Sequence, residues 1–457
     1  SFWTSLQDAV DEIEGGEVAL PLAGIADALG AYELAIGTVN ALNYCDPDGT
    51  TDNTTGLQAA IAVAAGRRLY FPKATYVLRA TYAYGNGLWI DAPNTVLEFA
   101  PGAIIKGHAA SAVGLSLVNI AATNIQIIGG IFDGNGIDDC FGILIRNGSS
   151  RVLIARNTFQ GVEFPIYGSG STSRVTIRDN NLLLRRWGIL TQDASTPKRW
   201  IIADNHIDGS TMVGGGDAIE INTPDGWAED FIISGNTIDS ILQYPPASFS
   251  GIGIGVAHVR RGTISNNIVR NCGLDGIHVE DDSSEIVISG NVVTDCDRAG
   301  IAVNGGNGTA PLRDVIVQGN TVRECGKTQG AGAIALEGPI AVEECVVDGN
   351  TVVGCGPGIG AEFFGIDLNH AAIGHRVTNN IVRGTLGTTA YGLRLDDCTD
   401  VQVSGNRLTD QDYAILVAGN ITRTQIAHNH LHGNATGTID ESAIGSTSAY
   451  TKVDNIT

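Results

Sequence analysis

The sequence is poor in methionine, in basic residues and in long apolar runs, and these shortages argue against several classes of protein. Met212 is the single methionine among 457 residues. Lysine and arginine total 27 against 49 aspartates and glutamates, which gives a net charge of −22. That charge argues against nucleic acid as a partner, because phosphate binding needs a basic surface. No run of 18 apolar residues occurs, so we expect no membrane insertion.

Glycine is abundant instead, at 60 residues, and the chain repeats a short apolar motif that ends in asparagine. Stretches such as "RVLIARNTF" and "DVQVSGNRL" share one frame, with gaps of 23 to 31 residues between their asparagines. Eleven asparagines occupy this point of the repeat: Asn157, Asn180, Asn205, Asn236, Asn267, Asn291, Asn320, Asn350, Asn380, Asn406 and Asn429. Short strands turned by Gly and Asn at this spacing predict an all-β parallel solenoid.

A second strand of the Gly-Ile type, such as "GIHV" at 276, precedes each repeated asparagine. Its alternation indicates that Ile277 and Val279 point into a core while His278 and Glu280 point outward. Because stacked coils superpose like on like, we expect the asparagines to form a ladder of side-chain amides between coils. We also expect the turn to use the tolerance of Asn for the left-handed conformation.

The cysteines show the same periodicity. Cys272, Cys296, Cys325 and Cys355 each lie five residues after a ladder asparagine, on four successive coils. They should stack in one column, about 4.8 Å apart along the axis. Since the chain has no CxxC pair and no His at zinc-ligand spacing, we predict no metal site and interpret the four as buried thiols.

Polar and acidic residues collect on the outward face of the middle Gly-Ile strands. The outward residue next to each inward Ile predicts a first column: Leu144, Tyr167, Leu190, Glu220, Gly253, His278, Ala302, Ala335, Asp367, Arg394 and Leu416. Two residues further on, a second column is predicted: Arg146, Ser169, Gln192, Asn222, Gly255, Glu280, Asn304, Glu337, Asn369, Asp396 and Ala418. Strands disfavour Asp and Asn, so this patch, from Glu220 to Arg394, is interpreted as a functional groove.

Long loops with aromatic side chains flank the same coils, and aromatic rings pack well against the apolar faces of sugars. The aromatics in or beside these loops are Trp187, Trp200, Trp227, Tyr244, Phe249, Phe363 and Phe364. We therefore predict a polysaccharide as the ligand. Trp187, Trp227 and Tyr244 are the candidate sugar-binding aromatics, and Asn222, Asn304 and Asn369 are the candidate polar contacts.

The N-terminal entry to the repeats resembles a known family. The run Asp48-Gly49-Thr50-Thr51-Asp52 is followed by a predicted helix over 55–65, capped by Thr54 or Thr55 and ended by Gly66, and then by Phe71-Pro72 and Tyr76. This order resembles the pectate-lyase-like right-handed parallel β-helix proteins, and bacteriophage tailspikes in particular. The resemblance implies a β-helix over 44–435 with an N-terminal cap helix, a neck over 1–43 and a tail or cap over 436–457.

The resemblance further implies an enzyme or binding protein for a bacterial surface polysaccharide, acting from a virion tail as a homotrimer. A secreted bacterial enzyme is the alternative location. Within the family the residues favour a carboxylate-based endo-acting hydrolase. A polysaccharide lyase that acts by β-elimination on a uronic acid, with Ca²⁺ as a possible cofactor, and a non-catalytic adhesin remain alternatives; otherwise we expect no cofactor.

Hydrolysis of a glycosidic bond uses one protonated and one ionised carboxyl group. Glu280 and Glu337 fall in one column two coils apart, about 9.6 Å by the strand spacing, near the top of the range of about 6.5–9.5 Å for inverting enzymes. We predict Glu280, Glu337 and Asp367 as the acid and base, with Glu220 and Asp217 as further candidates. His278 and Arg394 are predicted to orient the substrate or to bind an acidic sugar.

Overall fold

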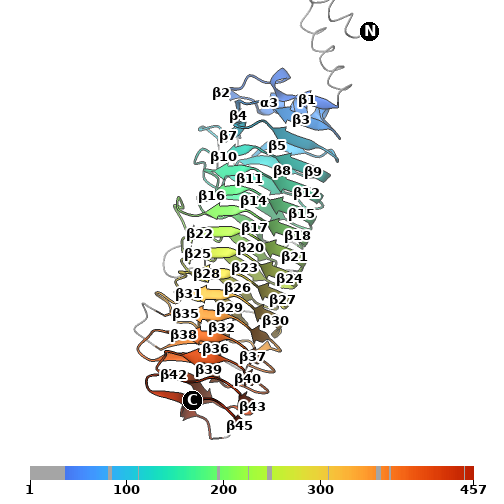
Figure 1. Ribbon diagram of the computed structural model, residues 1–457. Helices are drawn as coiled ribbons and strands as arrows, with labels where there is room; N and C mark the ends of the chain where they lie inside the picture. Colours follow the sequence, from blue (N-terminus) through green and yellow to red (C-terminus); the bar gives the residue numbers. More distant parts are fainter. Residues whose placement is uncertain are drawn as a thin grey trace, which may run out of the picture.

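The chain winds into a single elongated stack of β-coils (Figure 1). The computed structural model describes residues 37–80, 85–111, 113–192, 196–224, 226–243, 250–306, 308–356, 362–369, 372–446 and 448–457. In these ranges every strand pair is parallel, and each strand pairs with its counterpart in the preceding and following coils. The predicted parallel solenoid is therefore confirmed. None of the helices in the described ranges is both long and apolar enough to cross a membrane.

Three sheets run the length of the stack, and each complete coil contributes to all of them. Sheet A contains β1 (Thr38–Asn40), β3 (Arg68–Phe71), β6 (Val96–Phe99), β9 (Thr123–Ile128), β12 (Ser150–Ala155), β15 (Ser173–Arg178), β18 (Lys198–Ala203), β21 (Ala228–Ser234), β24 (Val259–Ser265), β27 (Ser284–Ser289), β30 (Leu312–Gln318), β33 (Val342–Glu343), β34 (Val346–Asp348), β37 (Arg376–Thr378), β40 (Gln402–Ser404), β43 (Thr422–Ala427) and β45 (Ala449–Val453). Sheet B contains β2 (Asp48–Asp52), β4 (Thr75–Leu78), β7 (Ile104–Gly107), β10 (Ile131–Asp133), β13 (Thr158–Gln160), β16 (Asn181–Leu183), β19 (His206–Asp208), β22 (Thr237–Ile241), β25 (Ile268–Cys272), β28 (Val292–Thr294), β31 (Thr321–Arg323), β35 (Thr351–Val353), β38 (Ile381–Arg383) and β41 (Arg407–Thr409). Sheet C contains the Gly-Ile strands β5 (Asn86–Ile90), β8 (Ser116–Ile120), β11 (Phe141–Ile145), β14 (Phe164–Ser169), β17 (Ile189–Gln192), β20 (Ile219–Asn222), β23 (Ile254–Ala257), β26 (Ile277–Glu280), β29 (Ile301–Asn304), β32 (Ile334–Glu337), β36 (Phe363–Leu368), β39 (Ala390–Asp396), β42 (Tyr413–Gly419) and β44 (Gly437–Ile444).

The asparagine ladder lies in the turn between sheets A and B. Asn320, as one rung, donates from Nδ2 to the carbonyl of Ile288 at 2.9 Å and to Oδ1 of Asn350 at 3.0 Å. Its own Oδ1 accepts the backbone N–H and the side-chain amide of Asn291, both at 2.9 Å. The ladder begins at Asn157 and continues past the predicted rungs to Asn455, which accepts from Asn429.

The left-handed residue of this turn is not the ladder asparagine, so that part of the prediction is wrong. Positive φ falls on the residue before each rung, for example 57° at Arg156, 55° at Asn266 and 62° at Gly319. The ladder asparagine does not adopt positive φ, and its side-chain amide bonds to the neighbouring coils along the axis. The sharp turn and the hydrogen-bond ladder are thus carried by two adjacent residues.

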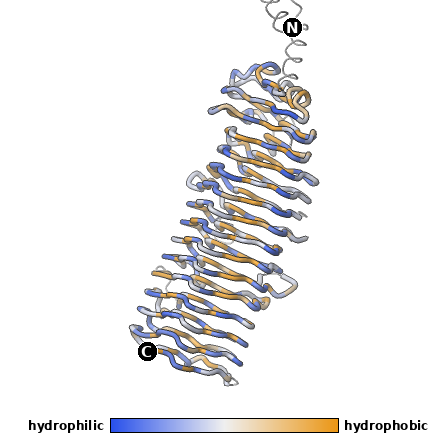
Figure 2. Tube along the Cα trace, turned by 45° about the vertical axis from the view of Figure 1, so that its right-hand side comes forward, coloured by the Kyte–Doolittle hydropathy of each residue, from blue (hydrophilic) through white to orange (hydrophobic). Residues whose placement is uncertain are grey.

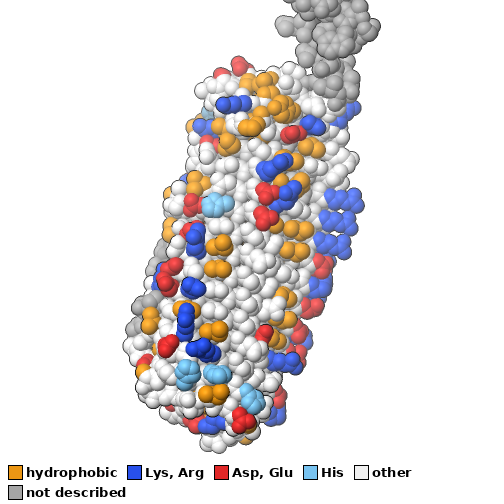
Figure 3. All heavy atoms as spheres, in the orientation of Figure 1, with side chains coloured by type: hydrophobic (Ala, Val, Ile, Leu, Met, Phe, Trp, Pro, Cys, Tyr) orange, Lys and Arg blue, Asp and Glu red, His pale blue; other side chains and the backbone are white. Residues whose placement is uncertain are grey.

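The core is a continuous apolar column inside the three sheets. Figure 2 shows the hydrophobic stretches recurring from coil to coil along the stack. Ile277 and Val279 are fully buried, as predicted. Cys272, Cys296, Cys325 and Cys355 are buried free thiols in this core, so the predicted unpaired state is confirmed. On the outside, the face in Figure 3 shows hydrophobic and charged side chains in rows along the axis, as expected when like residues stack on like.

Both described ends of the solenoid depart in detail from the prediction. The cap helix α3 spans Thr54–Val63, and its N-cap is Asn53 rather than Thr54 or Thr55. Asp52 supports the start by accepting the backbone N–H of Thr54 at 3.0 Å. The segment after 435 adds strands β44 and β45, which pair with β42 and β43. Residues 1–36, most of the predicted neck, lie outside the described residues.

One coil has a different register from the predicted one. The run "SGIGIGV" offers Ile252 and Ile254 as inward residues, and the prediction used Ile252. In the structure Ile254 pairs with Ile219 and Ile277, so Gly255 and Ala257 occupy the first and second outward columns. The other coils of the middle region, from β26 to β32, have the predicted register.

The ladder predicts a large stability loss when a rung is removed. Asn320→Ala should leave the buried amide groups of Asn291 without their acceptor, at about 1–3 kcal/mol for each unsatisfied group. Gln318→Ala is the matched control, because it removes an exposed amide from the same turn. Thermal unfolding monitored by circular dichroism should show a markedly lower midpoint for Asn320→Ala and little change in the midpoint for Gln318→Ala. Equal midpoints for the two variants would contradict a stabilising ladder.

Candidate active site

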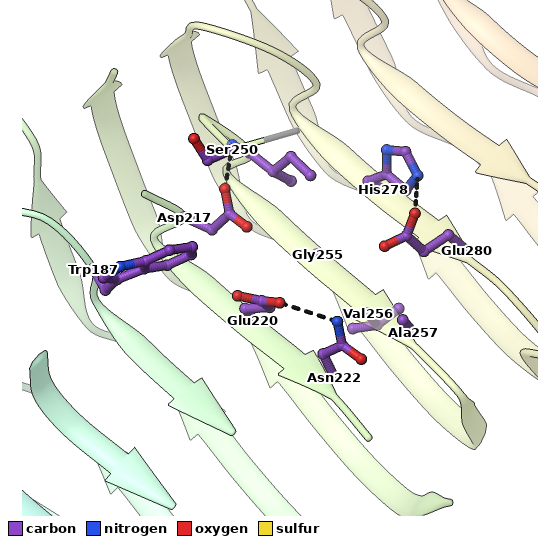
Figure 4. A pocket seen from close by; sticks show the side chains of 11 residues that line it. Trp187, Asp217, Glu220, Asn222, Ser250, Gly255, Val256, Ala257, His278 and Glu280 are labelled. Carbon is purple, nitrogen blue, oxygen red and sulfur yellow. Dashed lines mark hydrogen bonds and ion pairs between the residues drawn. The ribbon is translucent and has the colours of Figure 1, made fainter. Parts of the chain in front are cut away.

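An acidic pocket of about 280 Å³ opens on the outer face of sheet C. Figure 4 shows its lining side chains on strands β20, β23 and β26 and on the loops before them, with Trp187 from the loop before β17. The lining comprises Trp187, Asp217, Glu220, Asn222, Ser250, Ile252, Gly255, Val256, Ala257, His278 and Glu280. Six of the residues predicted from the sequence to form the site therefore meet in one place.

The pocket exists because the middle coil has small residues. Glu220 pairs in register with Gly255, and Gly255 with His278. In the next outward column Asn222 pairs with Ala257, and Ala257 with Glu280. With no large side chain in these two columns of the middle coil, a hollow about two strand spacings wide, about 9.6 Å, separates the polar groups of the two outer coils.

Asp217 is a buried carboxyl group that faces another acid. Its side chain is anchored because Oδ1 accepts the backbone N–H groups of Gly251 and Ile252, both at 2.8 Å. Burial and then the negative charge of Glu220 raise the pKa of Asp217 well above its ordinary value. Asp217 is therefore the carboxyl group of the pocket that is best suited to hold a proton.

Glu280 has the opposite character. Burial alone would raise its pKa, but His278 lowers it below the ordinary value. Nε2 of His278 lies 3.3 Å from Oε2 of Glu280, a charge contact rather than a well-aligned hydrogen bond. Nδ1 of His278 makes a hydrogen bond of 2.6 Å with Asp275. Glu280 is thus held ionised at the edge of the pocket, with 36% of its side chain exposed.

Glu337 shares the predicted column with Glu280, through Asn304 between them. It lines a separate pocket of about 500 Å³, together with Asn304, Gly338, Pro339 and Asn369, which we call the Glu337 pocket. Its carboxylate is paired with Arg298. The structure therefore places the predicted pair Glu280 and Glu337 in two neighbouring pockets rather than in one.

Asp367 faces outward in the predicted column, but Arg394 covers it. Arg394 donates to both carboxylate oxygens at 2.6 and 2.8 Å and lies 4.1 Å from the ring centroid of Phe364. Burial raises the pKa of Asp367 to about 6, although the guanidinium opposes this rise. With 1% of Asp367 exposed, this pair stabilises the outer face and does not open into either pocket described above.

The candidate sugar-binding residues are also divided between places. Trp187 forms one wall of the acidic pocket (Figure 4). Asn222 donates to Glu220 at 3.2 Å, and its buried Oδ1 has no hydrogen-bond partner among the described residues. Trp227 instead packs under Arg260 beside sheet A, at 4.9 Å. Tyr244 lies outside the described residues. Two further predicted aromatics are buried in the core: Trp200 and Phe363.

The sequence columns missed Asp275 and Arg298, which contact the groups of both pockets. Asp217 and Asp275 each lie two residues before the inward isoleucine of their strand, Ile219 and Ile277. This position precedes the strand and has the inward parity, so the alternation would place both aspartates in the core; a polar residue repeated at this position is the signal that could have singled them out. Across the ranges that the structure describes, no three His, Cys, Asp or Glu side chains are grouped closely enough to hold a metal ion.

The chain belongs to the family of right handed beta helix region proteins, whose pattern matches residues 187–455. Among solved structures, it is similar to the Dettilon tailspike protein, with 17% identity, coverage of 84% of this chain and 69% of that chain, and a TM-score of 0.57. It is also similar to the tailspike protein of E. coli bacteriophage HK620, solved in complex with pentasaccharide, with 13% identity, coverage of 92% and 79%, and a TM-score of 0.60. No curated protein matches the chain significantly.

The site predicts that His278 stays protonated far above neutral pH. Burial lowers its pKa, but Asp275 and Glu280 outweigh this and raise it to about 10, from about 6.5 in an unfolded chain. The stabilisation from this protonated imidazole should be complete below about pH 6.5 and disappear as the pH rises through about 10. Histidine-labelled protein should show by NMR no titration of His278 near neutral pH, with His278→Gln identifying the signal. A midpoint near 6.5 would contradict the assignment.

Proposed function

We propose that the protein is an endo-acting depolymerase that hydrolyses a bacterial surface polysaccharide in the acidic pocket. The observation that carries this proposal is the pairing of two carboxyl groups with opposite pKa shifts across one hollow. Burial and the charge of Glu220 raise the pKa of Asp217, whereas His278 lowers the pKa of Glu280. Glycoside hydrolysis needs one protonated and one ionised carboxyl group, and two environments that shift the pKa values apart provide them.

In this mechanism Asp217 is the general acid and Glu280 the general base. Asp217 gives its proton to the glycosidic oxygen as the bond from that oxygen to the anomeric carbon breaks. Glu280 takes a proton from the water whose oxygen attacks the anomeric carbon. The two residues lie two coils apart, about 9.6 Å along the axis, and are further separated because they occupy different columns. This separation exceeds the roughly 5–5.5 Å of retaining enzymes, so we propose an inverting reaction with a water molecule between base and sugar. Solvent then returns the proton to Asp217 and removes it from Glu280.

Two neighbouring groups are suited to hold the sugar, and a third acts on the proposed acid. The ring of Trp187 offers a flat apolar wall for the C–H face of a pyranose. The unpaired Oδ1 of Asn222 is an acceptor for a sugar hydroxyl. Glu220 keeps the proton on Asp217 by its charge and is positioned by the amide of Asn222.

The contacts of His278 favour hydrolysis over β-elimination. A lyase needs a cation that neutralises the carboxylate of a uronic acid. The two ring nitrogens of His278 face Asp275 and Glu280, so its charge serves the protein's own carboxylates. Arg394, the other predicted cation, is likewise engaged with Asp367.

The proposal that the protein acts like a tailspike rests on the similarity of fold and on the acidic pocket. We propose that the protein acts from a virion tail, outside the bacterial cell. The HK620 tailspike protein, which has a similar fold over most of both chains, was solved with a pentasaccharide. A spike that binds polysaccharide without cleaving it is distinguished from this proposal by the assays below.

Substitution of the acid and the base should abolish cleavage while leaving the fold intact. Asp217→Asn and Glu280→Gln should each lower kcat by about 10²–10⁴-fold, the usual contribution of such a group. Glu337→Gln should lower kcat less, because the carboxylate of Glu337 lies in the neighbouring pocket. New reducing ends from a panel of purified capsular polysaccharides and lipopolysaccharides are the readout, with Asp295→Asn as the charge-matched control on a different surface.

Near wild-type rates in both Asp217→Asn and Glu280→Gln would contradict the assignment. An ultraviolet-absorbing unsaturated product would contradict hydrolysis and favour the lyase. Binding of a glycan by the unmodified protein without any new reducing ends would favour the adhesin.

We also propose that the protein is a homotrimer, on the basis of its tailspike-like fold. Light scattering coupled to size-exclusion chromatography should then report about three times the chain mass of 47.6 kDa. A particle mass equal to that of one chain would contradict the trimer without affecting the assignment of the acidic pocket.

A further inference from the structure

A chain of five charged side chains connects the acidic pocket to the Glu337 pocket. It begins at Glu280, passes through His278 at 3.3 Å and reaches Asp275 at 2.6 Å. From Asp275 it continues to Arg298 at 2.7 Å and ends at Glu337, which is paired with the same guanidinium. Negative and positive groups alternate along the whole series, so each member stabilises the charged state of the next.

Asp275 is the centre of this series and is completely buried. Its Oδ2 atom accepts from Nδ1 of His278 and from Nη1 of Arg298, so a single oxygen contacts both cations. Its Oδ1 atom accepts the backbone N–H of Ala299 at 2.8 Å, which fixes the plane of the carboxylate. Both cations are therefore oriented by one anchored group.

A comparison within the molecule shows what these cations do. Asp217 has the same position two coils earlier, before the inward Ile219, and its Oδ1 also accepts backbone N–H groups. Its pKa is raised, by burial and by Glu220. Burial acts in the same direction on Asp275, but Arg298 and His278 outweigh it and lower the pKa. Equivalent backbone sites thus hold one carboxyl group with a raised pKa and one with a lowered pKa, because their neighbours differ.

We propose that Asp275 is a positioning residue for the reaction: through His278 it holds Glu280 in place as the base, and through Arg298 it holds Glu337 in the adjoining pocket. This inference rests on the proposed function for its kinetic consequences, but the arrangement of the charged groups can be tested without any substrate. Asp275 itself touches neither pocket, because it lies beneath the two cations.

The charged groups around His278 come from several coils. Asp275 and Glu280 face its two nitrogens from its own coil. Asp217 lies within its electrostatic reach from the coil of β20. Arg298, from the following coil, shares Asp275 with it. His258 is near enough to Glu280 to lower the pKa of that carboxylate as well.

Loss of the charge at Asp275 should act first on the imidazole. Without its anionic partner, His278 should release its proton at lower pH, and Glu280 should then lose its cationic neighbour. The pKa of Glu280 should rise, so the acid limb of the pH–rate profile should move to higher pH. Glu280 should also become less well placed, which lowers kcat more than it raises KM.

The experiment uses Asp275→Asn in the full chain. We expect kcat to fall about 10-fold to 100-fold, less than for removal of the base itself, with the acid limb shifted upward by about one pH unit or more. NMR of labelled histidine should show the midpoint of His278 moving down from about 10. Asp295→Asn, which removes a carboxylate paired with Lys327, is the control and should leave the limb and the midpoint unchanged.

A double variant tests whether Asp275 acts through His278. Asp275→Asn combined with His278→Gln should shift the acid limb no further than His278→Gln alone, since both changes remove the same contact. Additive shifts of the acid limb would overturn the proposal. It would also be overturned if Asp275→Asn changed stability alone and left the acid limb and the His278 midpoint at their wild-type values.

Asp275→Asn could disturb folding, since an amide cannot accept from Ala299 and from both cations at once. Arg298→Gln then provides the second measurement, because Arg298 is partly exposed. It removes a positive charge beside His278 and leaves Oδ2 of Asp275 to the imidazole alone, so the His278 midpoint should rise. Because Arg298 also holds Glu337, the variant should bind the substrate polysaccharide more weakly. A wild-type His278 midpoint together with wild-type affinity would overturn the proposal. A protein whose His278 midpoint responds as expected but that cleaves no glycan would retain the positioning network and refute the proposed function.

Discussion

The stacking register of the coils is the constraint on which the rest of this molecule depends. Each ladder asparagine bonds to the preceding and the following coil, so a slip of a single residue in any coil would break the ladder and turn the core residues outward. Because the register is maintained from rung to rung, a residue's position within its coil determines whether it lies in the core, in a turn or on the surface. A site on this fold is therefore made by substituting residues in fixed columns.

The acidic pocket shows how few substitutions such a site requires. Two small residues on one coil, Gly255 and Ala257, open a hollow between the polar groups of its neighbours. The backbone continues through this coil without a break, so the rigid sheet supports the carboxyl groups from beneath. The pKa of Asp217 and the pKa of Asp275 shift in opposite directions because different side chains surround them. The same scaffold position thus holds a carboxyl group that faces another acid in one coil and a carboxylate that binds two cations in another.

The fold could be predicted from the sequence because its determinants are local and repeated. The spacing of the asparagines and the alternation around Ile277 are sufficient to assign strands, turns and most of the outward columns. The one register error arose at "SGIGIGV", where Ile252 and Ile254 are equally suitable for the core and only the neighbouring coils decide between them. The left-handed turn residue was misassigned because it directly precedes the ladder asparagine, and Asn is itself a residue that tolerates positive φ.

The site was only partly predictable, because its chemistry depends on contacts between coils. The columns identified Glu220, Asn222, His278 and Glu280, and the structure brings these together. They could not show that Arg298 reaches back to Asp275, or that Arg394 covers Asp367, since long side chains cross between coils without a fixed spacing. Pairing of this kind decides which carboxyl groups remain available for a substrate. For this reason we propose Asp217, rather than Glu337 or Asp367, as the partner of Glu280.

The central claim is that a polysaccharide is cleaved between Asp217 and Glu280. A crystal structure of the Asp217→Asn variant with an oligosaccharide from its polysaccharide substrate would test it most directly. We expect two sugar rings to lie along the outer face of sheet C, one against Trp187. Their linking oxygen should be within hydrogen-bond distance of the residue at 217, and a water molecule should lie between the anomeric carbon and Glu280. An oligosaccharide bound at another surface, with the acidic pocket filled by solvent, would contradict it.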